Sequence, residues 1–423
     1  MPPLVQTEVR PYQIAVEDEK LTDLRDRLCR AALPDELDGA GWDLGAPLPD
    51  VSQILTYWRD TYDWRAAEAR LNREFPQFVT SVAVDGFDPI DIHFVHQRCT
   101  AAPEQAIPLV FVHGWPGSFY EGTKIVHPLS EGGPGDDVPG FHVVVPSLPN
   151  FGFSQGPNKL GFSIQHHAEA LHKLMLRLGY TEYATQGGDW GWFITRAMAV
   201  RYPSHVRASH YNMDQGSPPS FTAHPRLAIE HALTPYSADE KRGFARTQWF
   251  GAHGSGYYKI QSTKPQTMGY ALRDSPVALL AWVYEKLHDW TDAYPWTHDE
   301  ICTWISIYWF STAGPQASVR RYYEFRQNSA PKAGAERRTF SHKELAKPLK
   351  DNRVKIGLSH FPRDLCVLPS SWTRTQGDVV YEKRHPSGGH FPAWERPEAI
   401  VADLRAMFRK GGGATKGFRN TKL

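Results

Sequence analysis

Asp189 is the residue of this chain best placed to act as a nucleophile. It lies in the run Y-A-T-Q-G-G-D-W-G-W-F-I-T-R, where Gly187 and Gly191 stand two positions to either side. Small residues at this spacing let a strand turn sharply into a helix and expose the central side chain. A carboxylate there attacks an electrophilic sp3 carbon and forms an alkyl ester, whereas a serine typically attacks a carbonyl carbon. The alternative is a Gly-Gly-Asp turn whose aspartate caps the helix, and the motif alone leaves both interpretations open.

Asp364 and His390 could complete a catalytic triad with Asp189, because nucleophile, acid and histidine in that chain order is a known arrangement. Asp364 follows a strand predicted over 354–358, and His390 lies in a Gly-Gly-His turn after the next predicted strand. A lone histidine in such a turn is a weak signal. The chain order and the positions of Asp364 and His390 after predicted strands nevertheless all fit a catalytic triad. Asp364 would then hold the imidazole in its working tautomer, and the imidazole would act as the base.

The loop H-G-W-P-G-S follows a short apolar strand and could supply donors to an oxyanion. The backbone N–H groups of Trp115 and Trp190 are the best candidates for this role. A cis or otherwise strained bend is expected at Trp115-Pro116, with a plain Pro-Gly turn as the alternative. Three further loop residues support the motif: His113, Gly114 and Pro116.

Strands and helices alternate from Leu109 onward, which is typical of an α/β protein with a mostly parallel sheet. Strands are predicted over 109–112, 141–145 and 183–188, and a helix over 164–178. The sheet resumes at 354–358 and near 379–381, and a last helix is predicted over 397–408.

Two regions do not follow this alternation. Residues 1–100 carry Leu21, Leu24 and Leu28 on one face of an amphipathic helix, which precedes a second helix over 51–75 and a strand pair over 78–84 and 90–95. Residues 215–345 are rich in Trp, Tyr and Pro and contain helical stretches over 276–290 and 299–310. The predicted organisation is an N-terminal extension (1–100), a first core part (101–214), a helical cap (215–345), a second core part (346–410) and a flexible tail (411–423).

Composition excludes several classes of function. The chain has 423 residues and a formal net charge of +1, which provides no global field for nucleic acid or for an anionic membrane.

Its four cysteines, Cys29, Cys99, Cys302 and Cys366, are far apart and predict reduced thiols. His166, His167 and His172 lack a metal-ligand pattern and are interpreted as a solvated face. We expect neither a metal nor a cofactor, and the expected partner is a small, weakly charged molecule.

The termini bear on localisation. The first residues lack the order of a signal peptide, and no run approaches the roughly 18 apolar residues that span a bilayer, so we expect a cytoplasmic protein without an integral membrane anchor. The chain ends in Thr421-Lys422-Leu423, which is close to a peroxisomal address without matching it, and a peroxisomal location is the minor alternative.

The elbow G-G-D-W-G, the loop H-G-W-P-G-S, the segment F-P-R-D and the turn G-G-H-F together resemble the epoxide hydrolases of the α/β-hydrolase fold. The chain is most similar to the microsomal branch, which includes juvenile hormone epoxide hydrolases and soluble fungal and bacterial members. The resemblance covers nearly the whole chain, since that branch also carries an N-terminal extension. It implies hydrolysis of a lipophilic epoxide to a vicinal diol through a hydroxyalkyl ester on the aspartate, in detoxification or secondary metabolism.

The resemblance also implies two cap tyrosines that donate to the epoxide oxygen. The segment G-Y-Y-K-I-Q-S-T-K-P-Q-T places the first at Tyr257, and R-R-Y-Y-E-F places the second at Tyr323. Each lies in a doublet, so Tyr258 and Tyr322 stay open. Phenols suit the role because a pKa near 10 keeps them protonated at neutral pH.

Two other functions compete with this interpretation. A haloalkane or haloacid dehalogenase of the same fold also uses an aspartate nucleophile, but a departing halide prefers indole or amide donors to tyrosines. A non-catalytic small-molecule receptor would have no use for a base and an orienting acid behind a nucleophile. An ester hydrolase would need a serine at position 189. A homodimer is possible.

Overall fold

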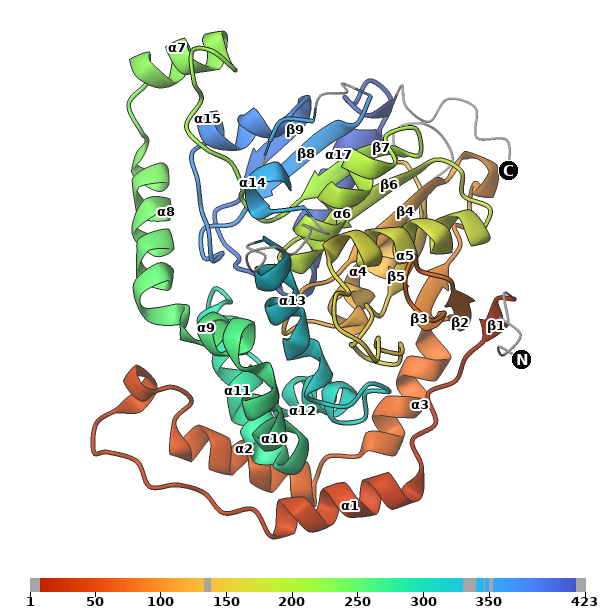
Figure 1. Cartoon of the computed structure of the whole chain (residues 1–423), viewed down its shortest axis with the longest axis vertical. Helices are drawn as coiled ribbons and strands as arrows, with labels where there is room; N and C mark the ends of the chain where they lie inside the picture. Colours follow the sequence, from red (N-terminus) through yellow and green to blue (C-terminus); the bar gives the residue numbers. More distant parts are fainter. Residues whose placement is uncertain (1–7, 133–137, 330–339, 346, 350–352, 416–423) are drawn as a thin grey trace.

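The fold is built around one large sheet (Figure 1). The computed structural model describes residues 8–132, 138–329, 340–345, 347–349 and 353–415. Within them the strand order is β1-β2-β3-β5-β4-β6-β7-β8-β9. The strands are β1 (Arg10–Pro11), β2 (Gln77–Val82), β3 (Ile90–Gln97), β4 (Ile107–Val112), β5 (Phe141–Pro146), β6 (Tyr183–Gly187), β7 (Val206–Tyr211), β8 (Lys355–His360) and β9 (Val379–Arg384).

The neighbours β5-β4-β6-β7-β8-β9 pair in parallel, whereas the neighbours β1-β2-β3-β5 pair antiparallel, so β5 joins the two parts of the sheet. Every residue of β4 and β5 is buried, as expected for parallel strands covered on both faces. The predicted α/β-hydrolase fold with a mostly parallel sheet is therefore confirmed. Strand β7 was not predicted, because V-R-A-S-H-Y has too few apolar residues for a buried strand.

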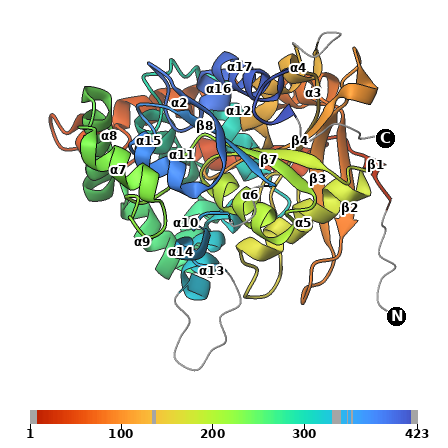
Figure 2. The ribbon, with the colours of Figure 1, turned by 90° about the horizontal axis from the view of Figure 1, so that it is seen from above.

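Helices cover both faces of the sheet (Figure 2). Helices α5 (Ile164–Arg177) and α6 (Trp190–Arg201) pack together on one face, and α4 (Thr123–Ser130) and α17 (Pro397–Phe408) pack together on the other. The expected solvated face of α5 is wrong. His166, His167 and His172 are all buried, because this side of α5 is covered by neighbouring segments rather than by water.

The described residues between β7 and β8 form helices and no strand. These are α7 (Pro225–Leu233), α8 (Ala238–Trp249), α9 (Gly256–Thr263), α10 (Pro265–Asp274), α11 (Pro276–Asp289), α12 (His298–Trp309), α13 (Arg320–Ser329) and the short α14 (His342–Leu345), and we refer to the helices from α7 to α13 as the cap. Helix α9 packs along α13, and α11 packs against α10 and α12.

The N-terminal residues form α1 (Asp18–Cys29), α2 (Leu48–Asp60) and α3 (Trp64–Glu74) ahead of β2. The single helix expected over 51–75 is wrong. The chain breaks after Asp60, and the Asp63 carboxylate accepts a hydrogen bond from Ala66 N at 3.1 Å, which caps a new helix.

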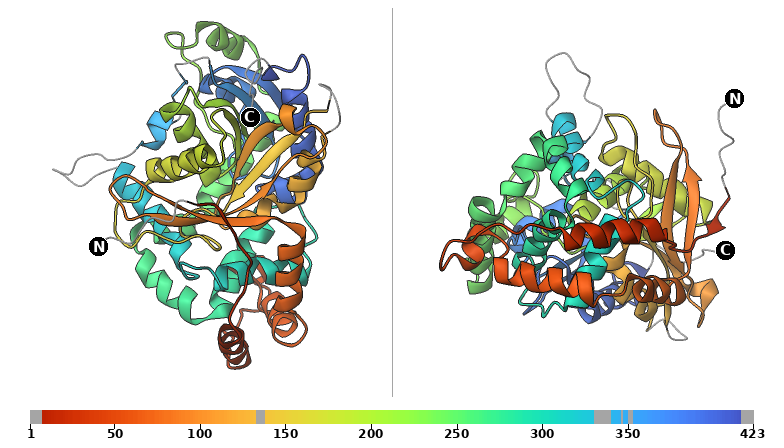
Figure 3. Two further views of the ribbon diagram at one scale, coloured as in Figure 1. Left: turned by 90° about the vertical axis from the view of Figure 1, so that its right-hand side faces the viewer. Right: turned by 90° about the horizontal axis from the view of Figure 1, so that it is seen from below.

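This N-terminal segment joins the cap to the core (Figure 3). Its strands extend the sheet through the β3–β5 pair. Helices α1 and α2 pack against α11, and helices α2 and α3 pack against α12. Tyr62 Oη donates to Thr303 Oγ1 at 3.1 Å, and the Trp42 ring stacks on His288 with centroids 3.5 Å apart.

Several sequence-based expectations concern the chain ends and single residues. The flexible tail was expected over 411–423. Ala414 is buried and its N–H donates to Met407 O on α17, while 416–423 lie outside the described residues. All four cysteines are free, as predicted. No helix in the described ranges has the length and apolarity needed to cross a membrane. Nor do the described residues include a group of three or more His, Cys, Asp or Glu side chains that could hold a metal ion.

Candidate active site

Asp189 forms the turn between β6 and α6. Its backbone has φ 48° and ψ −127°, a conformation that L-residues rarely adopt and that is common at functional sites. The turn requires small neighbours, since a Cβ on Gly191 would lie 1.8 Å from Val112 O and one on Gly187 would lie 2.8 Å from the Gly191 carbonyl carbon. The carboxylate is thereby held at the carboxyl end of the sheet, directed toward the loop after β4.

That loop supplies a donor to the carboxylate. Trp115 N donates to Asp189 Oδ1 at 2.8 Å, and the Trp115–Pro116 peptide bond is cis. Gly114 is required here, because a Cβ on it would lie 2.4 Å from the Asp189 side chain. Trp190 is the first residue of α6, where backbone N–H groups have no partner within the helix.

His113 fixes the shape of the same loop. Its Nδ1 donates to Gly114 O at 2.9 Å and its Nε2 accepts from Leu148 N at 3.1 Å, which defines the neutral tautomer. Burial lowers the pKa of His113 to about 3, so it carries no charge at neutral pH. His113 therefore positions backbone groups and is not available as a base.

Cap helix α12 holds this loop from above. Trp304 Nε1 donates to Pro116 O and Tyr308 Oη donates to Gly117 O, both at 2.6 Å. The donor at Trp115 is thus fixed by the cap as well as by the core.

His390 lies between two carboxylates. Its Nδ1 is 2.6 Å from Asp364 Oδ1, and its Nε2 is 3.6 Å from Asp189 Oδ2. Asp364 Oδ1 also accepts from Leu365 N at 2.7 Å, and His390 N donates to Trp290 O at 2.7 Å. Burial opposes the imidazolium, but the charges of Asp364 and Asp189 and the hydrogen bond to Asp364 outweigh it and raise the pKa of His390.

Two phenols from the cap face Asp189. Tyr257, on α9, stacks on the Trp115 ring with centroids 5.1 Å apart, and Tyr322, on α13, lies edge-on to Trp115, Trp190 and Tyr257. Burial and the Asp189 charge raise the pKa of both phenols well above its ordinary value. Both hydroxyls therefore stay protonated and can donate.

The structure brings Tyr322, and not Tyr323, to this site. Tyr323 is half-buried and lines a pocket between the loop after β5, the start of α10 and α13, and Asp189 does not line that pocket. Adjacent residues of a helix point about 100° apart, so only one member of a doublet can face the carboxylate. The structure therefore places Tyr322 rather than the expected Tyr323 beside the carboxylate. It places Tyr257 there rather than Tyr258, which is only partly buried and meets the Tyr322 ring edge-on.

Two buried charged residues near the site were not predicted. Glu121 follows the H-G-W-P-G-S loop, and burial raises its pKa to about 8. Arg321 precedes Tyr322 and is also fully enclosed. Neither has a motif of its own, although the position of Arg321 beside a tyrosine of the site could have drawn attention to it.

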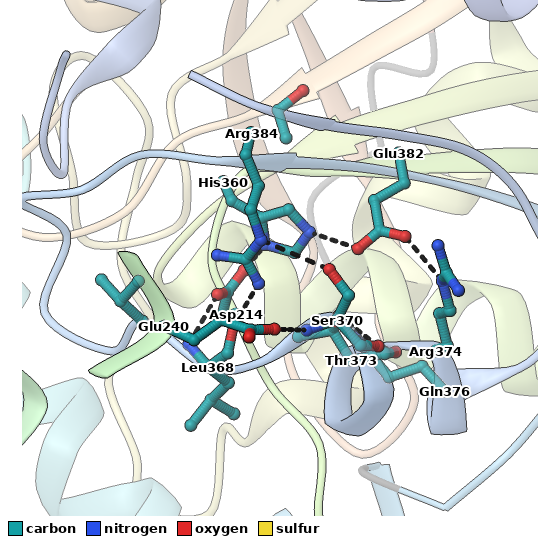
Figure 4. A network of polar contacts seen from close by, with 12 residues as sticks. Asp214, Glu240, His360, Leu368, Ser370, Thr373, Arg374, Gln376, Glu382 and Arg384 are labelled. Atoms are coloured by element: carbon teal, nitrogen blue, oxygen red, sulfur yellow. Dashed lines mark hydrogen bonds and ion pairs between the residues drawn. The ribbon is translucent and has the colours of Figure 1, made fainter. Parts of the chain in front are cut away.

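A second histidine supports the start of the loop that carries Asp364 (Figure 4). His360, the last residue of β8, is 2.5 Å from Asp214 Oδ1 through Nδ1 and 3.0 Å from Glu382 Oε1 through Nε2. Asp214 Oδ2 also accepts from Leu368 N at 2.8 Å, which ties down the chain after Asp364. Burial disfavours the charged imidazole, but Asp214 and Glu382 together raise the pKa of His360 to about 9.

Asp214→Asn is expected to destabilise the protein most at low pH. The folded pKa of His360, about 9, exceeds the unfolded value of about 6.5, so the stabilisation is complete below pH 6.5 and is lost as pH rises through 9. Breaking this buried pair should cost about 3 kcal/mol at pH 6. Urea unfolding at pH 6 and pH 9.5 measures both values. Asp239→Asn, which removes a partner from the exposed Asp239–Arg242 pair, is the control. An equal loss from Asp214→Asn at the two pH values would contradict a charged His360.

Comparisons with known proteins agree with this geometry. A model of the epoxide hydrolase N terminus matches residues 9–122, and one of the alpha/beta hydrolase fold matches residues 107–223. Epoxide hydrolase 1 of Sus scrofa is 33% identical over 94% of this chain and 88% of its own length. The chain belongs to the epoxide hydrolase family. The resemblance inferred from the four motifs is thus confirmed.

Two solved structures of epoxide hydrolases match this chain over almost its whole length. The Aspergillus niger epoxide hydrolase is 33% identical, with a TM-score of 0.77 over 96% of this chain and 97% of that one. The juvenile hormone epoxide hydrolase of the silkworm Bombyx mori is 27% identical, with a TM-score of 0.79 over 95% of this chain and 94% of that one. The N-terminal segment and the cap are therefore shared with these members of the family.

Proposed function

We propose that this protein hydrolyses a lipophilic epoxide to a vicinal diol through a hydroxyalkyl ester on Asp189. One observation carries the proposal: two buried, protonated phenols, Tyr257 and Tyr322, face the carboxylate that His390 also faces. An epoxide opens to a poorly departing alkoxide, so attack on carbon needs simultaneous donation to the ring oxygen.

In the first step Asp189 Oδ2 attacks an epoxide carbon. Oδ1 already accepts the Trp115 N–H, which leaves Oδ2 as the free nucleophile. The new bond joins Oδ2 to carbon, the carbon–oxygen bond of the ring breaks, and its electron pair stays on the ring oxygen. That oxygen takes a proton from one of the two tyrosines, and the resulting phenolate takes the proton that the His390 imidazolium gives up once the ester has formed.

Ester formation prepares His390 for the second step. The neutral ester replaces one of the two anions that raise the pKa of His390, so the pKa falls and the imidazole can lose its proton. His390 Nε2 then removes a proton from water as the water oxygen attacks the ester carbonyl carbon. The negative charge moves onto Asp189 Oδ1, where the N–H groups of Trp115 and Trp190 stabilise it. Collapse of this intermediate breaks the ester bond, and the departing oxygen takes the proton from the imidazolium. The carboxylic acid left at Asp189 then gives its proton to His390, which restores the starting charges.

A dehalogenase is the second candidate because Trp190 Nε1 is buried without a hydrogen-bond partner among the described residues. An indole N–H in that position could hold a departing halide. The pair of phenols favours the epoxide, because a halide needs no proton on leaving.

Oxygen-18 labelling tests the proposed reaction. Styrene oxide is turned over repeatedly in water enriched in oxygen-18, and the tryptic peptide that contains Asp189 is analysed by mass spectrometry. We expect diol release and incorporation of one oxygen-18 into Asp189, because water attacks the carboxyl carbon. Diol whose new oxygen derives from solvent in the first turnover would contradict the ester. Halide release from a chloroalkane without diol from the epoxide would favour the dehalogenase.

Tyr322→Phe is expected to slow ester formation, whereas Tyr323→Phe is not. Removal of one preorganised donor typically lowers the rate by about 100-fold or more. The two variants make the same chemical change at adjacent positions, and only Tyr322 lies beside Trp115 and Trp190. Rapid-quench measurement of the first turnover separates this step from ester hydrolysis. A larger loss in Tyr323→Phe would restore the original assignment.

A further inference from the structure

Arg321 is a buried cation without a hydrogen-bond partner among the described residues. Its side chain is 2% exposed, and Nε, Nη1 and Nη2 all lack a bonding partner. The guanidinium lies 5.0 Å from the Trp190 ring and 5.9 Å from the Phe151 ring. Aromatic faces attract a cation only weakly compared with the cost of removing five N–H donors from water.

An uncompensated buried charge is costly to the folded state, so its partner is expected to arrive with a ligand. Burial lowers the pKa of Arg321 to about 9, and the Asp189 charge opposes that shift. Asp189 is therefore the anion that partly compensates the guanidinium in the free protein. In the proposed reaction this charge disappears when the ester forms, which leaves Arg321 uncompensated at that stage.

Arg321 lines a pocket of about 480 Å³ between the loop after β5, the start of α10 and α13. Asn150 also lines it, with a buried Oδ1 that has no partner among the described residues. A half-turn of the amide exchanges its oxygen and NH2 group, so Asn150 can present either to a ligand. Of the other charged residues that line the pocket, Lys159, Lys264 and Arg320 are cationic and Glu324 is anionic.

The pocket therefore has a cationic lining and a buried guanidinium that is free to make a forked pair of hydrogen bonds. A carboxylate matches this fork, because two parallel N–H groups meet its two oxygens. The guanidinium lies 5.0 Å from the ring of Trp190, the residue that follows Asp189, so a group held at Arg321 would lie near the reacting carboxylate.

We propose that Arg321 binds a carboxylate carried by the substrate, so that the preferred substrates are epoxides with an anionic acid group attached to a lipophilic body. This inference rests on the proposed epoxide hydrolysis and adds the substrate class.

Matched acid and ester substrates test the proposal. Diol formation is measured for para-oxiranylbenzoate and ω-epoxyundecanoate, each against its methyl ester. At least one acid is expected to exceed its ester in kcat/KM by about 10- to 100-fold, the value of a hydrogen-bonded charge. Arg321→Gln should bring this ratio near one, mainly through KM, and Arg321→Lys should restore part of it. Arg320→Gln removes the same charge from the pocket lining and should change the ratio less than about fivefold. An unchanged ratio in Arg321→Gln overturns the proposal.

Binding separates this proposal from the reaction itself. Decanoate and inorganic phosphate are titrated calorimetrically into the wild-type chain and into Arg321→Gln. Decanoate should bind, with an affinity at least about tenfold weaker in the variant. If styrene oxide gives no diol but decanoate binds in this way, the reaction is wrong and the anion site stands. Binding of phosphate without decanoate, or equal decanoate affinity in both proteins, overturns the carboxylate site.

The melting temperature gives a readout that does not depend on a ligand. Arg321→Met fills the same space without a charge, so the ligand-free variant is expected to melt at a higher temperature than the wild type. A lower melting temperature would mean that the guanidinium serves the fold, which would overturn its assignment to a ligand.

Discussion

Asp189→Ala is expected to lower diol formation by about 10,000-fold or more, because the loss of a nucleophile leaves only the binding and oxyanion groups to act. Asp364 of the proposed triad cannot replace it. Asp364 is occupied by His390 Nδ1 and by Leu365 N, and its backbone lies on a different loop. Steady-state diol formation from styrene oxide measures the effect.

An Asp→Ala substitution at an exposed position is the control for effects of expression, purification and folding. Asp43 is exposed and far along the chain from the elbow, and Asp43→Ala should keep wild-type activity. The melting temperature of Asp189→Ala is expected to fall below that of the wild type, because the change removes an anion beside Arg321 and His390, and it shows whether the variant is folded at the assay temperature. Diol formation within tenfold of the wild-type rate would show that water attacks the epoxide directly.

His390→Gln is expected to separate the two chemical steps. Asp189 and both phenols remain, so the epoxide should still alkylate the carboxylate, but no base remains to activate water. Turnover should fall by about 1,000-fold or more, and the ester should accumulate to one equivalent. Intact-protein mass spectrometry should show an increase equal to the mass of one epoxide, located on the peptide that contains Asp189.

His288→Gln is a suitable control because His288 is exposed on α11 and its ring nitrogen contacts Asp289 rather than Asp189 or Asp364. It should turn over normally and carry no adduct. Repeated turnover by His390→Gln without an adduct would mean that another group is the base. Absence of both adduct and turnover would mean that His390 is also needed for alkylation.

The three residues of the proposed triad could be brought together from sequence because each occupies a distinctive position in the fold. The elbow needs Gly187 and Gly191 for backbone clearance of less than 3 Å, so the local pattern of small residues reports the turn directly. Asp364 and His390 follow strands whose carboxyl ends meet at one edge of the sheet. The order of these residues along the chain and the ends of the predicted strands can both be determined from sequence, without knowledge of any side-chain contact.

The tyrosines and Arg321 depend on helix rotation, which the sequence did not provide. Tyr322 and Tyr323 differ by one residue, and the choice between them follows from how α13 packs along α9. The same rotation buries Arg321 beside Trp190, although an Arg-Arg-Tyr-Tyr run suggests an exposed basic surface. The buried histidines of α5 were missed for a similar reason, since polar residues at helical spacing were assigned to solvent.

The bridging position of the N-terminal segment bears on how the protein unfolds. Its strands belong to the hydrogen-bonded sheet, its helices cover α11 and α12, and α12 in turn holds the loop that carries Trp115. We therefore expect the cap and the core to unfold together, because the N-terminal segment and α12 link them. A calorimetric scan should show one transition in which the sheet, the cap and the donor to Asp189 are lost together, so heat inactivation should track global unfolding rather than release of a lid.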